Sequence, residues 1–136
     1  MHLFTYGSLM FPAVWTTVVR GKYEQQPARL YGYQRCCIKG ETYPAAIAAG
    51  LGDYIDGQLY LDIDAADQQQ LDRFEGDDYD QVEAPLILAE GGIVMAQFYL
   101  YRFHEHIELR EWDEEWFERE GLKLFLAHYG GFGASA

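Results

Sequence analysis

The fold is decided by the stretch GQLYLDID (residues 57–64) and the segment AADQQQLDRFEG that follows it (residues 65–76). In the first part apolar residues alternate with polar ones and place Leu59, Leu61 and Ile63 on one face, which predicts a half-buried β-strand. Asp64 has the chemistry of a helix N-cap and Gly76 that of a C-terminal cap, so the residues between them are expected to be helical. A strand therefore passes directly into a helix.

The rest of the chain continues this mixture of strands and helices. Strands are expected at 2–6, 28–39, 44–49, 54–63, 81–89 and 93–103, and helices at 10–20, 65–75 and 111–129. Gly32 is expected to bend the long strand at 28–39, Gly91-Gly92 to turn a hairpin, and Gly121 to break the last helix. Residues 130–133 are expected to form a loose tail. This order predicts one α+β domain over residues 1–136, built on a curled, mostly antiparallel sheet.

The composition excludes several classes of partner. Of 136 residues, 22 are Asp or Glu and 10 are Lys or Arg, which gives a formal net charge of −12. Nucleic acid and anionic membrane surfaces are therefore not expected as partners, because both require a surplus of basic residues. A hydrophobic share of 49% rules out a disordered chain. Small molecules or proteins remain as partners.

The sequence is typical of a soluble, cytoplasmic protein. Its start has neither a basic region nor an apolar run of signal-peptide length, and no stretch approaches the roughly 20 apolar residues of a membrane span. The two cysteines, Cys36 and Cys37, are adjacent, and Cα atoms about 3.8 Å apart are too close for an ordinary disulfide. We expect both cysteines to pack in a strand rather than serve a redox or metal role.

Two local sequences are candidates for chemistry. Residues 4–9, FTYGSL, predict a strand that breaks at glycine and serine, where successive backbone N–H groups can bind a carboxylate or an oxyanion. An ordinary strand-end turn explains the same pattern. Glu75 stands at the negative end of the predicted helix dipole, and Asp72, Asp77 and Asp78 are close to it in sequence. Both effects raise its pKa towards the range of a general acid and base, although a solvated acidic loop has the same pattern.

Other motifs carry weaker signals. The segment HEHIE (residues 104–108) would place two imidazoles and a carboxylate on one face of an extended segment, but no further histidine or cysteine cluster supports a metal site. The sequence contains no phosphate-binding loop, dinucleotide fingerprint or nucleophile elbow. Trp112 and Trp116, four residues apart, are expected to pack in the core rather than form a protein-interaction surface.

Tyr6-Gly7-Ser8-Leu9, followed by Leu71-Asp72-Arg73-Phe74-Glu75-Gly76 and then Tyr79, resembles the gamma-glutamylcyclotransferase-like family. The pattern is most similar to its small gamma-glutamylamine cyclotransferase and plant avirulence-induced branch. The segments GY (32–33), YPAA (43–46) and GQLY (57–60) also resemble parts of that family. The resemblance covers roughly residues 1–103, and residues 104–136 are not placed in the family pattern.

The resemblance implies a small mixed, mostly antiparallel β-barrel packed by helices, with a pocket for a small-molecule gamma-glutamyl substrate. It implies Glu75 as the catalytic residue and a substrate-binding set of Tyr6, Gly7, Ser8, Leu9 and Tyr79. Tyr43 is a further candidate for the pocket. The resemblance implies no metal and no cofactor, and the oligomeric state stays open.

The implied reaction is attack of the substrate's α-amine on its own γ-amide carbonyl, which releases 5-oxoproline and a free amine. One carboxyl group with a raised pKa serves as base and then as acid. The family often has an arginine two residues after the motif tyrosine, whereas Gln81 stands there in this chain. The alternative function is a non-catalytic domain that binds or senses a small ligand on the same fold.

Overall fold

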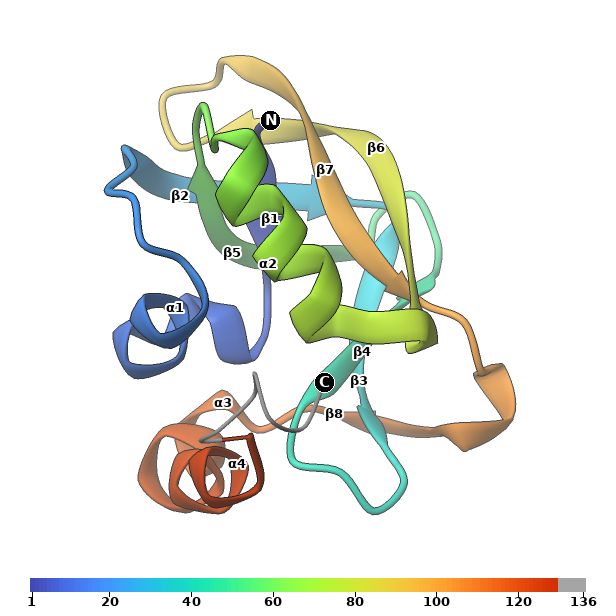
Figure 1. Ribbon diagram of the computed structural model, residues 1–136. Helices are drawn as coiled ribbons and strands as arrows, with labels where there is room; N and C mark the ends of the chain where they lie inside the picture. The colour runs from blue at the N-terminus through green and yellow to red at the C-terminus, as the bar shows by residue number, and fades with distance from the viewer. Residues whose placement is uncertain (130–136) are drawn as a thin grey trace.

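The computed structural model describes residues 1–129, which form a closed five-stranded barrel and a separate three-stranded sheet (Figure 1). Around the barrel the strands follow in the order β1 (Leu3–Thr5), β5 (Tyr54–Tyr60), β2 (Gln25–Tyr31), β6 (Tyr79–Leu88) and β7 (Ile93–Tyr101). The second sheet has the order β4 (Pro44–Ala48), β3 (Tyr33–Ile38) and β8 (Ile107–Glu111). The barrel closes through a parallel contact of β1 with β7, and its other strand pairs are antiparallel. The predicted α+β fold with a mixed, mostly antiparallel barrel is confirmed.

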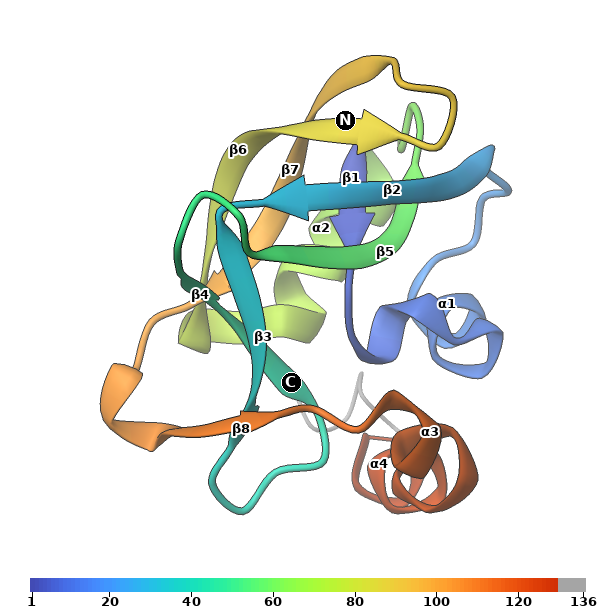
Figure 2. The ribbon, with the colours of Figure 1, turned by 180° about the vertical axis from the view of Figure 1, so that it is seen from behind.

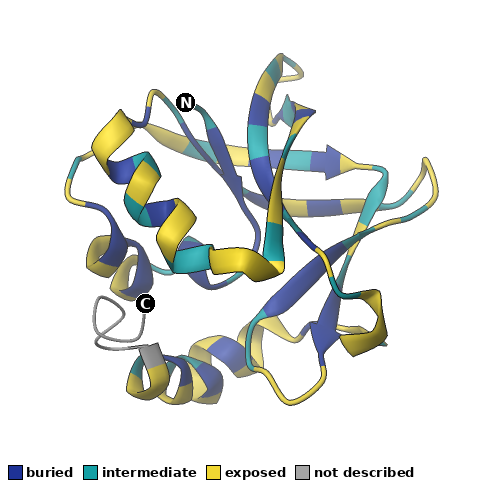
Figure 3. Cartoon of the chain, turned by 45° about the vertical axis from the view of Figure 1, so that its right-hand side comes forward, coloured by how far each residue is buried: buried dark blue, intermediate teal, exposed yellow. Residues whose placement is uncertain are grey.

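Helices pack beside the barrel, and their buried residues form a hydrophobic cluster with residues of the barrel strands. They are α1 (Pro12–Val18), α2 (Ala65–Glu75), α3 (Glu114–Trp116) and α4 (Leu122–Tyr129), joined by the 3-10 turns η1 (Ser8–Met10), η2 (Gly76–Asp78) and η3 (His104–His106) and the π turn η4 (Phe117–Gly121). The outward face of α2 is exposed, while its Leu71 is fully buried in one cluster with Leu3, Trp15 and Phe125 (Figure 3). No helix within residues 1–129 is long and apolar enough to cross a membrane.

The passage from β5 into α2 follows the local sequence closely. The strand ends at Tyr60, three residues earlier than the alternation predicts, because Asp62 takes a φ of 57° and turns the chain. Asp64 caps the helix by accepting a hydrogen bond from the Asp67 backbone N–H at 2.8 Å, and Gly76 ends it with a φ of 71°. Both predicted caps and the helix at 65–75 are therefore confirmed. The caps define where α2 ends and thereby the position of its last residue, Glu75.

The expectation of one bent strand over residues 28–39 is wrong. Gly32 has a φ of +88°, a conformation that a residue without a Cβ adopts at no steric cost, and it directs the chain from the barrel into the second sheet. Viewed from behind, β2 lies beside β5, and β3 leaves the barrel at this turn (Figure 2). The residues before and after Gly32 consequently build two different sheets.

The C-terminal region differs from expectation at three places. The helix expected from residue 111 begins at Glu114, because residues 107–111 form strand β8. Gly121 does not break the helix; it lies in the π turn η4, where a Cβ would come within 2.7 Å of the Trp116 ring, so the missing side chain permits close packing. Residues 104–106 form a 3-10 turn rather than an extended segment. The tail expected at 130–133 lies outside the described residues. The predicted hairpin is confirmed, because β6 and β7 pair over their whole length around Gly91 and Gly92.

Candidate active site

A cavity of about 830 Å³ is lined by residues of the barrel, the end of α2 and the second sheet. Its volume lies within the range of roughly 300–1,000 Å³ that is typical of small-molecule sites. The structure brings all the predicted site residues to its wall, namely Tyr6, Gly7, Ser8, Leu9, Tyr43, Glu75 and Tyr79. The segments that carry them are up to about seventy residues apart in the chain, yet they line one space. Their individual roles stay predictions.

The loop after β1 is held in place by a close approach to β4. A Cβ on Gly7 would lie 2.8 Å from the Cδ of Pro44, so only glycine fits there without a shift of one of the two strands. The chain then forms the 3-10 turn η1, in which the Met10 N–H donates to the Gly7 carbonyl at 3.0 Å. The first N–H groups of such a turn have no acceptor within it, which leaves them for other partners.

Tyr6 is fixed at both of its ends. Its hydroxyl donates to the backbone carbonyl of Tyr99 on β7, and its own carbonyl accepts a hydrogen bond from Arg35 Nη1 at 2.9 Å. Burial and then the nearby Glu75 carboxyl raise the pKa of Tyr6. The tyrosine therefore stays protonated at neutral pH and serves as a rigid wall of the cavity.

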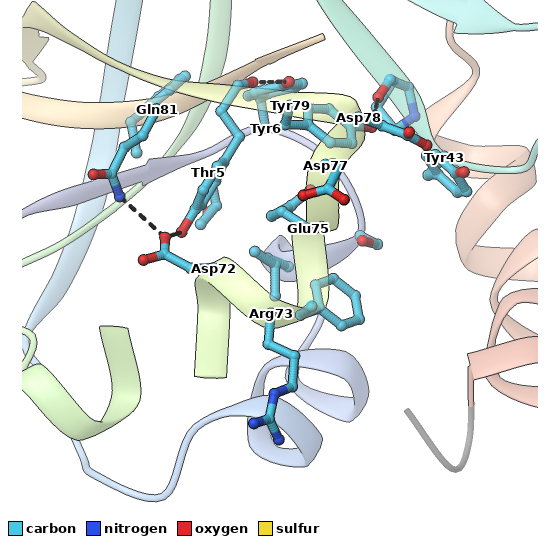
Figure 4. Close-up of a pocket in the computed structure, with 18 of the residues that line it drawn as sticks. Thr5, Tyr6, Tyr43, Asp72, Arg73, Glu75, Asp77, Asp78, Tyr79 and Gln81 are labelled. Carbon is cyan, nitrogen blue, oxygen red and sulfur yellow. Dashed lines mark hydrogen bonds between the residues drawn. The ribbon is translucent and has the colours of Figure 1, made fainter. Parts of the chain in front are cut away.

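Glu75 occupies the last position of α2 and lies in the middle of the site, between Asp72 and Gln81 on one side and Tyr43 on the other (Figure 4). Its side chain is half-buried. Removal from water raises its pKa from 4.5 to about 8, and the neighbouring Asp72 carboxylate adds to this increase. The predicted direction is found, but burial is its main cause.

Among residues 1–129, the side chains that hydrogen-bond to the Asp72 carboxylate are both neutral. The Tyr99 hydroxyl donates to its Oδ1 at 2.7 Å, and the Gln81 side-chain amide approaches the same oxygen at 3.4 Å (Figure 4). An arginine at position 81 would bring a positive charge to this carboxylate, whereas the glutamine leaves its negative charge uncompensated. The charge of Asp72 therefore acts on Glu75.

The opposite end of the cavity is aromatic. The Phe125 ring lies 6.0 Å from the Tyr43 ring and 5.9 Å from the Phe74 ring, between centroids. Next to them the Tyr79 hydroxyl donates to the Pro44 carbonyl at 3.2 Å. Burial and the nearby Glu75 raise the pKa of Tyr79, so it is a neutral donor as well. A ligand here meets acidic groups at one end and rings at the other.

The sequence did not indicate two residues that line the cavity, Tyr99 and Phe125, nor Arg35, which contacts the loop after β1 from outside it. Phe125 belongs to the C-terminal region, for which the resemblance supplied no pattern. Arg35 and Tyr99 stand in ordinary strand sequences and reach the site only through long-range packing. No local spacing could have indicated any of the three.

The other candidates do not form sites. Among residues 1–129 no group of three or more His, Cys, Asp or Glu side chains could hold a metal ion. His106 Nδ1 instead lies 3.2 Å from the Tyr101 hydroxyl. Cys36 and Cys37 are free and buried, and burial raises the pKa of both thiols, which disfavours the reactive thiolate. Trp112 is buried, as expected, whereas Trp116 is exposed, and the expectation that it packs in the core is wrong.

Known proteins resemble this chain in sequence and in fold. A family model described as gamma-glutamyl cyclotransferase, AIG2-like, matches residues 3–117. The chain is 29% identical to Protein AIG2 C of Arabidopsis thaliana over 118 residues, which cover 85% of this chain and 71% of that protein. A solution structure of another Arabidopsis thaliana protein has a TM-score of 0.71 and 24% identity, over 96% of this chain and 80% of that one.

A solved structure described as gamma-glutamyl cyclotransferase also superposes on this chain. Its TM-score is 0.66 and its identity 18%, over 79% of this chain and 68% of that one. At such identities the two structural matches establish a shared fold. The chain thus shares its overall fold with both of these solved structures.

Proposed function

The chain belongs to the gamma-glutamyl cyclotransferase, AIG2-like family, and from this premise we propose that it converts gamma-glutamyl amides into 5-oxoproline and a free amine. The proposal rests on the position of Glu75 in the structure. Its half-buried carboxyl, with a pKa raised to about 8, lines the same cavity as the loop at residues 6–9. A carboxyl group with a pKa near neutrality can both accept and return a proton.

The proposed reaction needs one proton carrier and no external nucleophile. Glu75 in its ionised form takes a proton from the substrate's α-ammonium group. The free amine attacks the γ-amide carbonyl, a C–N bond forms and closes the five-membered ring, and the C–N bond to the leaving amine breaks. Glu75 then returns its proton to the leaving nitrogen as that bond breaks. The ring nitrogen, which carries two hydrogens after the attack, gives up the second one to the ionised Glu75, which passes it to the released amine, so that the amine leaves as an ammonium ion. The substrate's atoms are all recovered in 5-oxoproline and the amine.

The tyrosines of the cavity are unsuited to carry this proton. The pKa values of Tyr6 and Tyr79 are both raised, so each hydroxyl keeps its proton at neutral pH. They serve in the proposal as walls that hold the substrate in a folded shape. Intramolecular attack gains most of its rate from such a shape, because the reacting atoms are already close.

The loop at residues 7–9 is proposed to bind the negative charge of the substrate. Backbone N–H groups at the start of η1 have no acceptor within the turn. The residues that carry them line the same cavity as Glu75. They suit the α-carboxylate or the oxyanion that develops on the γ-carbonyl. Since the cavity is acidic, local N–H donors are needed there to offset repulsion of an anionic group.

The proposal is tested by incubating the protein with a panel of gamma-glutamyl amines and dipeptides and measuring 5-oxoproline by chromatography. We expect release from at least one substrate, and a loss of about 100-fold or more in kcat for Glu75→Gln. Glu90→Gln, which removes the same charge from an exposed loop, is the matched control and should keep full activity. Unchanged activity of Glu75→Gln would exclude the assigned role.

A second candidate is a ligand-binding domain without turnover. The observation that favours it is the high pKa of Glu75 itself, because with a pKa of about 8 roughly a tenth of the carboxyl is ionised at pH 7. A protonated Glu75 donates a hydrogen bond and suits the binding of a neutral amide or lactam. Calorimetry decides between the two: tight binding of 5-oxoproline by a protein that turns over none of the panel supports the binding domain.

A further inference from the structure

Arg35, on β3, supports the loop at residues 6–9 from outside the cavity. It is absent from the cavity wall, yet its Nη1 donates to the carbonyl oxygen of Tyr6 at 2.9 Å. The guanidinium is always charged, so this is a charge-assisted hydrogen bond, which is stronger than a bond between neutral groups. The contact reaches the backbone at the residue where β1 passes into the loop.

This bond sets the direction of a neighbouring N–H group. The peptide between Tyr6 and Gly7 is planar and, like all peptide bonds described here, trans. In such a unit the C=O and N–H bonds point in opposite directions. Holding the Tyr6 carbonyl against Arg35 therefore orients the Gly7 N–H away from Arg35. The hydrogen bond from the Tyr6 hydroxyl to the Tyr99 carbonyl anchors the side chain of the same residue to β7.

Arg35 is itself held by the segment that follows β8. Its Nη1 also lies 3.0 Å from Glu114 Oε1, and its guanidinium carbon lies 4.9 Å from the centre of the Trp112 ring. The Trp112 indole N–H donates to the Thr42 carbonyl at 2.8 Å, which fixes the ring. Only 17% of the Arg35 side chain is exposed. The guanidinium thus contacts the Tyr6 carbonyl, the Glu114 carboxylate and the Trp112 ring.

We propose that Arg35 is a positioning residue, which orients the Tyr6–Gly7 peptide for substrate binding, and that Trp112 and Glu114 brace it. The role rests on the proposed function, because it acts on the loop that is assigned to the substrate. It also assigns a task to part of the region after residue 103. That region anchors the arginine that orders the site.

The test compares Arg35→Met, which keeps the apolar stem on Trp112, with Arg35→Lys, which restores one charged donor. Arg29→Met is the matched control, because Arg29 also pairs with a carboxylate, Asp56, at 2.7 Å and lies over a ring, Tyr54, at 3.7 Å, but on the outside of the barrel. Backbone amide NMR signals of Gly7, Ser8 and Leu9 report the orientation of the loop. Kinetics on the gamma-glutamyl panel report kcat and KM separately.

We expect Arg35→Met to shift the amide signals of residues 7–9 and to lower kcat/KM by roughly 10-fold or more. Arg35→Lys should recover part of both effects, and Arg29→Met should cause neither. Unmoved amide signals, an equal loss with Arg29→Met, or no recovery with lysine would overturn the role of Arg35. If Arg35→Met does not fold, Glu114→Gln replaces it. We then expect smaller changes of the amide signals and of kcat/KM in the same direction, and unchanged signals and kinetics would contradict the proposal that Glu114 braces Arg35.

The amide signals decide the role of Arg35 even if the proposed function fails. A wild-type protein that releases no 5-oxoproline refutes the function, while shifted loop signals in Arg35→Met still establish the positioning contact. If the wild type is active and the amide signals of residues 7–9 are the same in Arg35→Met, only the positioning role is refuted.

Discussion

Replacement of Glu75 by glutamine is expected to stabilise the folded protein, and the gain should grow as the pH rises. The carboxyl has a pKa of about 8 in the folded chain against 4.5 for an ordinary glutamate, so the folded state binds the proton more tightly than the unfolded state does. Below pH 4.5 both states are protonated and the residue contributes nothing. Between 4.5 and about 8 the unfolded state ionises first, and the stability of the wild type falls with increasing pH.

The magnitude follows from the interval between the two pKa values. Each pKa unit corresponds to about 1.4 kcal/mol, so at pH 7 the wild type loses about 3 kcal/mol, and above pH 8 about 5 kcal/mol. Both figures are upper bounds, because the side chain is half-buried and the cavity opens to water. Glutamine has a similar size and no charge, and removes this loss.

The assay is urea unfolding of the wild type and Glu75→Gln at intervals from pH 4 to pH 9. We expect equal free energies of unfolding at pH 4, and a difference in favour of the variant that rises and levels off near pH 8. The exposed Glu90→Gln is the control for loss of one negative charge from a chain of net charge −12. A difference that stays flat over the whole range would refute burial as the cause of the raised pKa.

Three further changes test other parts of the structure. Asp72→Asn removes the carboxylate that helps raise the pKa of Glu75. The midpoint that reports the ionisation of Glu75 in the pH profile of 5-oxoproline release should therefore move to lower pH. Gly7→Ala forces a Cβ to within 2.8 Å of Pro44 and should cost roughly 1–3 kcal/mol in thermal unfolding. Asp67→Asn should cost about 2–3 kcal/mol at pH 7, because its buried carboxylate accepts three hydrogen bonds that an amide cannot all accept.

Two of these changes, Gly7→Ala and Asp67→Asn, are checked further. Gly52→Ala meets no atom within 4 Å and should leave the melting temperature unchanged, so an equal loss there would remove the steric argument. Burial opposes ionisation of Asp67, but its hydrogen bonds outweigh that effect and lower its pKa. Its stabilisation is therefore present above the ordinary pKa of 3.8 and lost as pH falls below it, so the cost of Asp67→Asn should shrink towards pH 3. A constant cost would contradict this reasoning.

The comparison of sequence and structure separates local from non-local causes. Helix α2 was predictable to the residue, because an aspartate cap and a terminal glycine act within a few residues of the helix they bound. Gly32 was recognised as a bend, yet its neighbours enter two different sheets, since strand pairing depends on partners far away in the chain. Gly121 was expected to end a helix and instead makes room for the Trp116 ring.

The candidate site shows the same division. By itself the sequence determined the helix that ends at Glu75, the glycine turn after the first strand and the motifs that indicate the family, because these depend on neighbouring residues. Only the tertiary structure decided that these segments share one cavity, that burial is the main cause of the raised pKa of Glu75, and that Arg35 and Phe125 join them. The physical reason is that desolvation and long-range hydrogen bonds exist only once distant surfaces have packed together.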